Sequence, residues 1–144
     1  MYKHILIATD GSELSTKGLD QGLELAKQLG AKATIVTVTD VWASGALAAA
    51  GPATIAEYEE SMREAVQDIL SEAARFATDS GVPHDTVHIP NRYAADAIVE
   101  TAQDIGADLI VMASHGRRGF RKMLLGSQTT EVLTTSTVPV LVVR

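Results

Sequence analysis

A glycine-rich, basic stretch near the carboxyl end holds the residue types in this chain that could do chemistry. Four of the chain's 12 Lys and Arg residues lie between Ser114 and Ser127 and are interleaved with three glycines: Arg117, Arg118, Arg121 and Lys122 with Gly116, Gly119 and Gly126. Glycine lets the backbone approach an anion without an intervening Cβ, and successive N–H groups can form an anion-binding nest. We expect a helix after Gly126, with Ser127 as its cap, whose free N–H groups and dipole favour phosphate.

The same stretch fits a second interpretation, a surface loop whose arginines are only solvated. Spacing alone does not decide between the two. Neither G-x-x-x-x-G-K-[ST] nor G-x-G-x-x-G occurs, so a nucleotide site here must be of another type. His115 could contact a phosphate or orient the loop through a hydrogen bond. No carboxylate at a suggestive spacing gives it a catalytic role.

Five strand-like segments alternate with four helical ones, and this order predicts how the stretch is positioned. Apolar and β-branched runs cover residues 4–8, 34–38, 86–89, 108–113 and 138–143. Apolar residues keep helical spacing over 14–29, over 58–76 with a stop at 79–81, and over 94–102 with a stop at Gly106. A short helix is expected to begin at Gly126-Ser127. Strict alternation predicts an α/β fold: a single doubly wound, five-stranded parallel sheet in a three-layer sandwich. Ligands lie beyond the carboxyl ends of such strands, which points to the loops after the first and fourth.

Glycine and alanine mark two further features. Gly18 and Gly22 repeat inside the first helical segment and are expected to let that helix pack closely. Residues 41–52 are low in charge and rich in Ala and Gly, which predicts a loop that could close over a ligand.

Composition limits the classes of protein that remain. At 144 residues we expect one domain over 1–144, and zero Cys excludes disulfides and cysteine-based metal sites. A net charge of −6 argues against nucleic acid as a partner, because such binding depends on basic residues. The short apolar run at the start fits neither a signal peptide nor a membrane span, so a cytoplasmic protein is expected. His84 and His88 flank a predicted strand start, so no metal site is expected.

A signature spread over the loop carries a resemblance to a known family. Ala113-Ser114-His115-Gly116, nine residues, then Gly126-Ser127 resembles G-x-x-G-(nine residues)-G-[ST], the ATP-binding signature of the universal stress protein family. The run Ala8-Thr9-Asp10-Gly11-Ser12 and the last strand are similar to that family in order and spacing. The likeness extends over essentially the whole chain.

The resemblance implies a strand order of 3-2-1-4-5 and an ATP site, with Mg²⁺, across the carboxyl ends of the strands. Asp10 would meet the adenine or ribose, Val38 would line the adenine slot, and glycine amides would surround the triphosphate. The predicted nucleotide-binding residues are Ala8, Thr9, Asp10, Val38, Met112, Ala113, His115, Gly116, Arg117, Gly126, Ser127, Gln128 and Thr129.

Two positions depart from the family pattern. Ala113 replaces the first signature glycine, which would cost about 1–2 kcal/mol if the backbone there were left-handed and almost nothing at an ordinary strand end. We expect the second case, because Ala113 ends a predicted strand. Asn91-Arg92-Tyr93 follows the third strand, where relatives often have a glycine.

The last strand predicts a homodimer. A valine-rich edge with Pro139 near its start would leave backbone groups unpaired, and members of the family commonly pair this strand with its copy.

Three functions fit these features. The first is an ATP-binding stress-response regulator or adaptor with an unknown protein partner. The second is a dimeric interaction module that binds no nucleotide. The third is slow ATP hydrolysis or self-phosphorylation, with Ser or Thr near Ser127 as acceptor, although an enzyme is not favoured because no base is evident.

Overall fold

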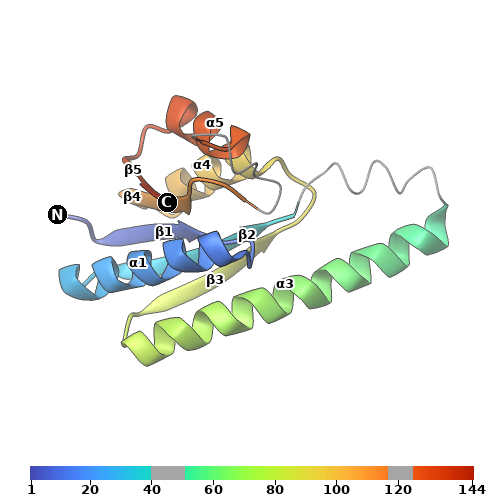
Figure 1. Ribbon diagram of the computed structural model, residues 1–144, viewed down its shortest axis with the longest axis horizontal. Coiled ribbons are helices and arrows are strands. Elements are labelled where there is room, and N and C mark those ends of the chain that lie inside the picture. Colours follow the sequence, from blue (N-terminus) through green and yellow to red (C-terminus); the bar gives the residue numbers. More distant parts are fainter. Residues whose placement is uncertain (40–50, 117–124) are drawn as a thin grey trace.

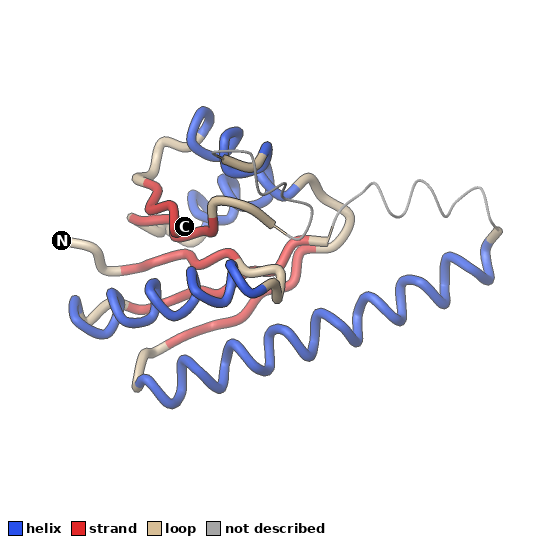
Figure 2. Tube along the Cα trace, viewed as in Figure 1, coloured by secondary structure: helices blue, strands red, loops and turns tan. Residues whose placement is uncertain are grey.

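The computed structural model describes residues 1–39, 51–116 and 125–144 of the chain. Its elements alternate in the predicted way: β1 (His4–Ala8), α1 (Glu13–Leu29), β2 (Lys32–Val38), α3 (Pro52–Ser80), β3 (His84–Ile89), α4 (Ala94–Asp104), β4 (Leu109–Ala113), α5 (Ser127–Thr135) and β5 (Val140–Val143). All strand pairs are parallel, in the order β3-β2-β1-β4-β5 (Figure 1; Figure 2). The predicted α/β fold, with its strand order and four helices, is confirmed.

The sheet is covered on both faces, which makes the three layers. α1 and α3 lie on one side of it and α4 and α5 on the other (Figure 1). Side chains alternate along β1, so Ile5 and Ile7 pack towards α1 and α3, while Leu6 packs towards α4 and α5. All three are fully buried, each contributing about 1.5–3 kcal/mol. β1 is therefore the centre of the core.

Strand ends differ from the predicted ones where local pairing decides them. β3 begins at His84, two residues earlier than expected, because Ala33 of β2 pairs with it. β5 begins at Val140, two residues later than expected, although the Pro139 C=O still accepts from the Ile110 N–H at 2.9 Å. Most of the loop predicted over 41–52 lies outside the described residues, and Pro52 is the first residue of α3.

Asn91 explains one departure from the family pattern. It has a φ of 56°, and it is the only residue other than glycine with a positive φ in the described part of the chain. Asparagine tolerates this left-handed region better than most residues. It can therefore make the turn after β3 that a glycine would make.

Within the described residues, none of the helices is both long enough and apolar enough to cross a membrane.

Close packing of α1 against the sheet was predicted to depend on both of its glycines, but only Gly22 is needed for it. A Cβ on Gly22 would lie 2.7 Å from Ile7 Cδ1, well inside van der Waals contact. A Cβ on Gly18 would meet only ordinary contacts, the nearest being Ala113 N at 3.6 Å. The two positions thus differ in how much room the sheet leaves.

We predict opposite effects for alanine at these two positions. Gly22→Ala overpacks the core against Ile7 and should lower the free energy of unfolding by about 1–3 kcal/mol. Gly18→Ala has room, so it should leave stability unchanged or raise it by up to about 1 kcal/mol through helix propensity. Urea denaturation of both variants measures this, and equal losses would contradict the packing account.

Candidate functional site

The turn between β1 and α1 holds the Asp10 carboxylate in one orientation. Asp10 Oδ1 accepts from the Ser12 N–H at 2.9 Å, and the Asp10 N–H donates to Ser15 Oγ at 3.3 Å. Ser12 is the cap of α1, as expected of that turn, because its Oγ accepts from the Ser15 N–H at 3.3 Å. Gly11 allows the turn with a φ of 79°. One carboxylate is thus fixed at the carboxyl end of the central strand.

The segment after β4 is held at both of its described ends. The Ser114 N–H donates to the Val143 C=O at 2.8 Å, and the Gly126 N–H donates to the Ser114 C=O at 2.7 Å. Ser114 Oγ and His115 Nδ1 lie 2.9 Å apart, in line with the interpretation of His115 as a loop-orienting residue. Residues 114 and 126 are therefore neighbours across the signature stretch.

The two predicted loops meet at Gly116. A Cβ on Gly116 would lie 2.9 Å from Asp10 Oδ2, so glycine is what lets the carboxylate lie against this backbone. The contact follows from the sheet, because β1 and β4 are neighbours with Ile7 opposite Val111. Gly126 is also confined, since a Cβ there would lie 3.1 Å from the Ser114 carbonyl oxygen.

The amino end of α5 opens beside these glycines. Gly126 is the N-cap with extended backbone (φ −69°, ψ 158°), and Ser127 is the first helical residue. The prediction that Ser127 caps this helix is therefore wrong: the capping position falls one residue earlier, on a residue without a side chain. The first N–H groups of a helix have no partner within it and favour anions.

The Gln128 side chain has a role that was not predicted. Its Oε1 accepts from the Ala95 N–H at 2.9 Å and so satisfies the amino end of α4. This bond leaves its backbone N–H, the group predicted to face a phosphate, unaffected.

Other predicted residues lie at the same edge of the sheet. Ala8, Val38 and Met112 contribute to the core on the α4 and α5 side. Ala113 ends β4 in ordinary strand backbone, which confirms that alanine brings no left-handed strain here. Arg117 lies outside the described residues.

The end of β2 is anchored to β3. The Thr39 N–H donates to the Ile89 C=O at 3.0 Å, and Thr39 Oγ1 lies 3.0 Å from His88 Nε2. Burial lowers the pKa of His88, and the nearby Arg63 charge lowers it further. A neutral imidazole is favoured beside Thr39, which helps to hold the strand end that follows Val38.

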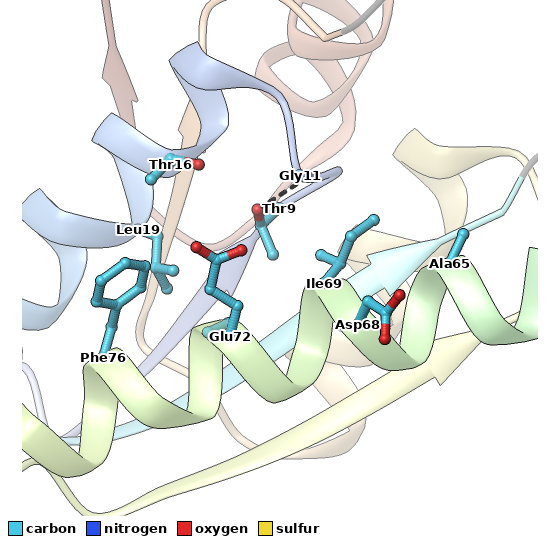
Figure 3. Close-up of a pocket in the computed structure, with 10 residues that line it drawn as sticks. Thr9, Gly11, Thr16, Leu19, Ala65, Asp68, Ile69, Glu72 and Phe76 are labelled. Atoms are coloured by element: carbon cyan, nitrogen blue, oxygen red, sulfur yellow. Dashed lines mark hydrogen bonds between the residues drawn. The ribbon is translucent and has the colours of Figure 1, made fainter.

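A cavity of about 320 Å³ lies beside the β1–α1 turn, between α1 and α3 (Figure 3). Thr9 and Gly11 line it, with Leu19 and Phe76 as apolar walls. The carboxylates of Asp68 and Glu72 also line it, and they would repel a polyphosphate. This cavity is unsuited to the ligand that the signature predicts.

No group of three His, Cys, Asp or Glu residues is arranged to hold a metal ion in the described ranges.

Two buried hydroxyls at this edge were not predicted. Thr37 Oγ1 donates to the Thr9 C=O at 2.8 Å, and Ser15 Oγ lies 3.1 Å from Thr9 Oγ1. Both side chains are about 3% exposed. For Thr37, the available signal was a polar residue at an inward position next to a predicted strand end.

We predict that Gly116→Ala displaces the Asp10 carboxylate, because the new methyl group would lie 2.9 Å from Oδ2. The amide resonances of Asp10 and Ser12 should move in ¹H–¹⁵N spectra, while stability changes by less than about 1 kcal/mol. In an Asp10→Ala background, the same substitution should leave the Ser12 resonance in place. An equal shift in both backgrounds would show that the contact is not the cause.

Comparison with known proteins agrees with the fold and the family resemblance. The family model of the universal stress protein family matches residues 1–144. Universal stress protein MJ0531 of Methanocaldococcus jannaschii is 34% identical over 144 residues, covering 100% of this chain and 83% of that protein. Universal stress protein YxiE of Bacillus subtilis is 34% identical over 149 residues, covering 100% of both. The crystal structure of a universal stress protein in complex with cAMP has a TM-score of 0.72 and 26% identity, covering 99% of this chain and 97% of that one. This chain belongs to the universal stress protein family.

Proposed function

We propose that this protein binds an adenine nucleotide, ATP with Mg²⁺, at the carboxyl ends of β1 and β4, and acts through it as a stress-response regulator in the cytoplasm. The observation that carries the proposal is the convergence of the Asp10 carboxylate, the Gly116 backbone and the start of α5. The relative solved with cAMP supports an adenine nucleotide as the class of ligand.

The residues at this edge suit the two halves of such a ligand. Asp10 offers a carboxylate oxygen to ribose hydroxyls or the adenine amino group, beside the apolar Val38. Backbone N–H groups at Gly116 and at the first turn of α5 would receive the phosphates. The ligand would join the two loops, with its ribose or adenine on Asp10 and its phosphates on the backbone N–H groups, and Mg²⁺ would neutralise part of the phosphate charge.

A bound nucleotide that contacts both loops would change how they lie relative to each other. The two loops leave different strands and contact each other through Asp10 and Gly116. A ligand held by both would favour the arrangement in which they are close, and a partner could distinguish this surface from the empty one.

We predict that Ser127→Asp weakens ATP binding by at least about tenfold, because it places a carboxylate where the phosphates would lie. Ser127 is exposed at the first position of α5, so an acid there should raise stability by about 0.3–1 kcal/mol through the helix dipole. Calorimetric titration with Mg·ATP and thermal unfolding measure the two effects.

Ser127→Asn is the matched control, with the same shape and no charge, and it should bind within about threefold of the natural protein. Equal affinity of the natural protein and Ser127→Asp would place the phosphates elsewhere. A natural protein without measurable ATP binding would favour the nucleotide-free interaction module.

We also propose that two copies pair along β5, which pairs only with β4 in the described sheet. Leu141 of this edge strand is 38% exposed, although it belongs to an apolar strand. An edge with unpaired N–H and C=O groups and an exposed leucine is a surface that a second copy can cover.

We predict that Leu141→Lys shifts the protein towards a monomer, because it buries a charge in the pairing surface. Leu29→Lys is the matched control, since Leu29 at the end of α1 is also 38% exposed. Light scattering after size-exclusion chromatography gives both masses. A dimer that survives Leu141→Lys and is lost in Leu29→Lys would move the interface to the end of α1.

A further inference from the structure

Each of the two peptide groups that follow β1 and β4 is held at both ends. The Thr9 C=O and the Asp10 N–H belong to one planar group, so two bonds fix its orientation. The carbonyl accepts from Thr37 Oγ1 of β2 at 2.8 Å, and the N–H donates to Ser15 Oγ of α1 at 3.3 Å. Because the plane precedes the Asp10 Cα, it sets the direction in which the carboxylate leaves the turn.

The peptide group after β4 repeats this arrangement. The Ala113 C=O accepts from Thr129 Oγ1 of α5 at 2.9 Å, and the Ser114 N–H donates to the Val143 C=O of β5 at 2.8 Å. The Ser114 C=O then receives the Gly126 N–H at 2.7 Å. Thr129 therefore links the strand end to the helix that starts beside the signature glycines.

Both threonine hydroxyls are out of reach of a ligand. Thr37 is 3% exposed and Thr129 is 2% exposed. Each side chain uses its hydroxyl on a carbonyl at the end of another element, which an isosteric valine could not do. Neither residue needs its hydroxyl to fill space in the core.

We infer that Thr37 and Thr129 are positioning residues that set the two halves of the nucleotide site, acting through the Thr9 and Ala113 carbonyls. This inference rests on the proposed function. Thr129, one of the predicted nucleotide-binding residues, acts here from beneath the site. Thr37 lies outside the signature and contributes from the neighbouring strand.

A purely structural role is the competing explanation, and the chain contains a control for it. Thr34 lies in the same strand as Thr37, is 2% exposed, and bonds His4 Nε2 at 2.7 Å at the opposite edge of the sheet. Thr134 is the control within α5, where its hydroxyl bonds the Thr130 C=O of the same helix at 2.8 Å. A loss of stability alone should be shared by Thr34→Val, whereas an effect on the site should not.

The experiment measures Mg·ATP affinity by calorimetry for Thr37→Val and Thr129→Val, with their serine counterparts Thr37→Ser and Thr129→Ser. Each valine variant should bind about tenfold more weakly, the worth of one lost hydrogen bond, and each serine variant should recover most of the affinity. Thr34→Val and Thr134→Val should bind as the natural protein does. Natural affinity in both valine variants, or equal losses in the controls, would overturn the inference.

Spectra of the ligand-free protein separate this inference from the nucleotide proposal. Thr37→Val should move the ¹H–¹⁵N resonances of Asp10 and Gly11, Thr37→Ser should restore them, and Thr34→Val should leave them in place. Unmoved resonances would overturn the positioning role even if ATP binds. If these resonances move but the natural protein binds no ATP, the positioning role stands and the nucleotide site is refuted. If one valine variant does not fold, the serine variant at that position and the valine and serine variants at the other positioning threonine test the inference.

Discussion

The pairing of β1 with both β2 and β4 is the constraint on which the site depends. From β1 the chain adds β2 and β3 on one side of the sheet, and it returns to add β4 and β5 on the other. Loops that leave β1 and β4 therefore lead to helices in opposite layers, and the general rule for such sheets places a ligand crevice between the two loops at the carboxyl edge. The contact between the Asp10 carboxylate and the Gly116 backbone lies in that crevice.

Burial keeps this arrangement rigid. β1 contributes three fully buried residues to the core, and every residue of β4 is buried. Two strands packed on both faces cannot move apart without exposing apolar surface, so their ends are a firm base for two short turns. Packing fixes the interiors of the strands, and hydrogen bonds fix their ends. Among the described residues, every buried side-chain polar atom has a hydrogen-bond partner.

Sequence patterns predicted the sheet because strand and helix periods differ clearly in this chain. The apolar run at residues 108–113 predicted a strand covered on both faces. Of the two glycines predicted to let the first helix pack closely, only Gly22 proved to be confined by the sheet. The Gly116 and Gly126 positions were also readable, since glycine is tied to close backbone approach. Asp10 entered the predicted site through its place in the family pattern.

Contacts between distant elements could not be read in the same way. The pairing of Gln128 with α4 and of Thr37 with the Thr9 carbonyl depends on register and side-chain direction, which one sequence does not specify. The expected cap at Ser127 was wrong for a related reason. Serine near a helix start favours the capping position, but here the last residue with extended backbone is Gly126, and Ser127 is already helical.

The central claim is that the crevice between the β1 and β4 loops holds the nucleotide. A crystal structure of the protein grown with magnesium and a non-hydrolysable ATP analogue tests it most directly. The account predicts phosphate oxygens against the Gly116 backbone and the first turn of α5, with ribose or adenine beside Asp10. Density for the analogue between α1 and α3, or none in the crevice at saturating concentration, would contradict it.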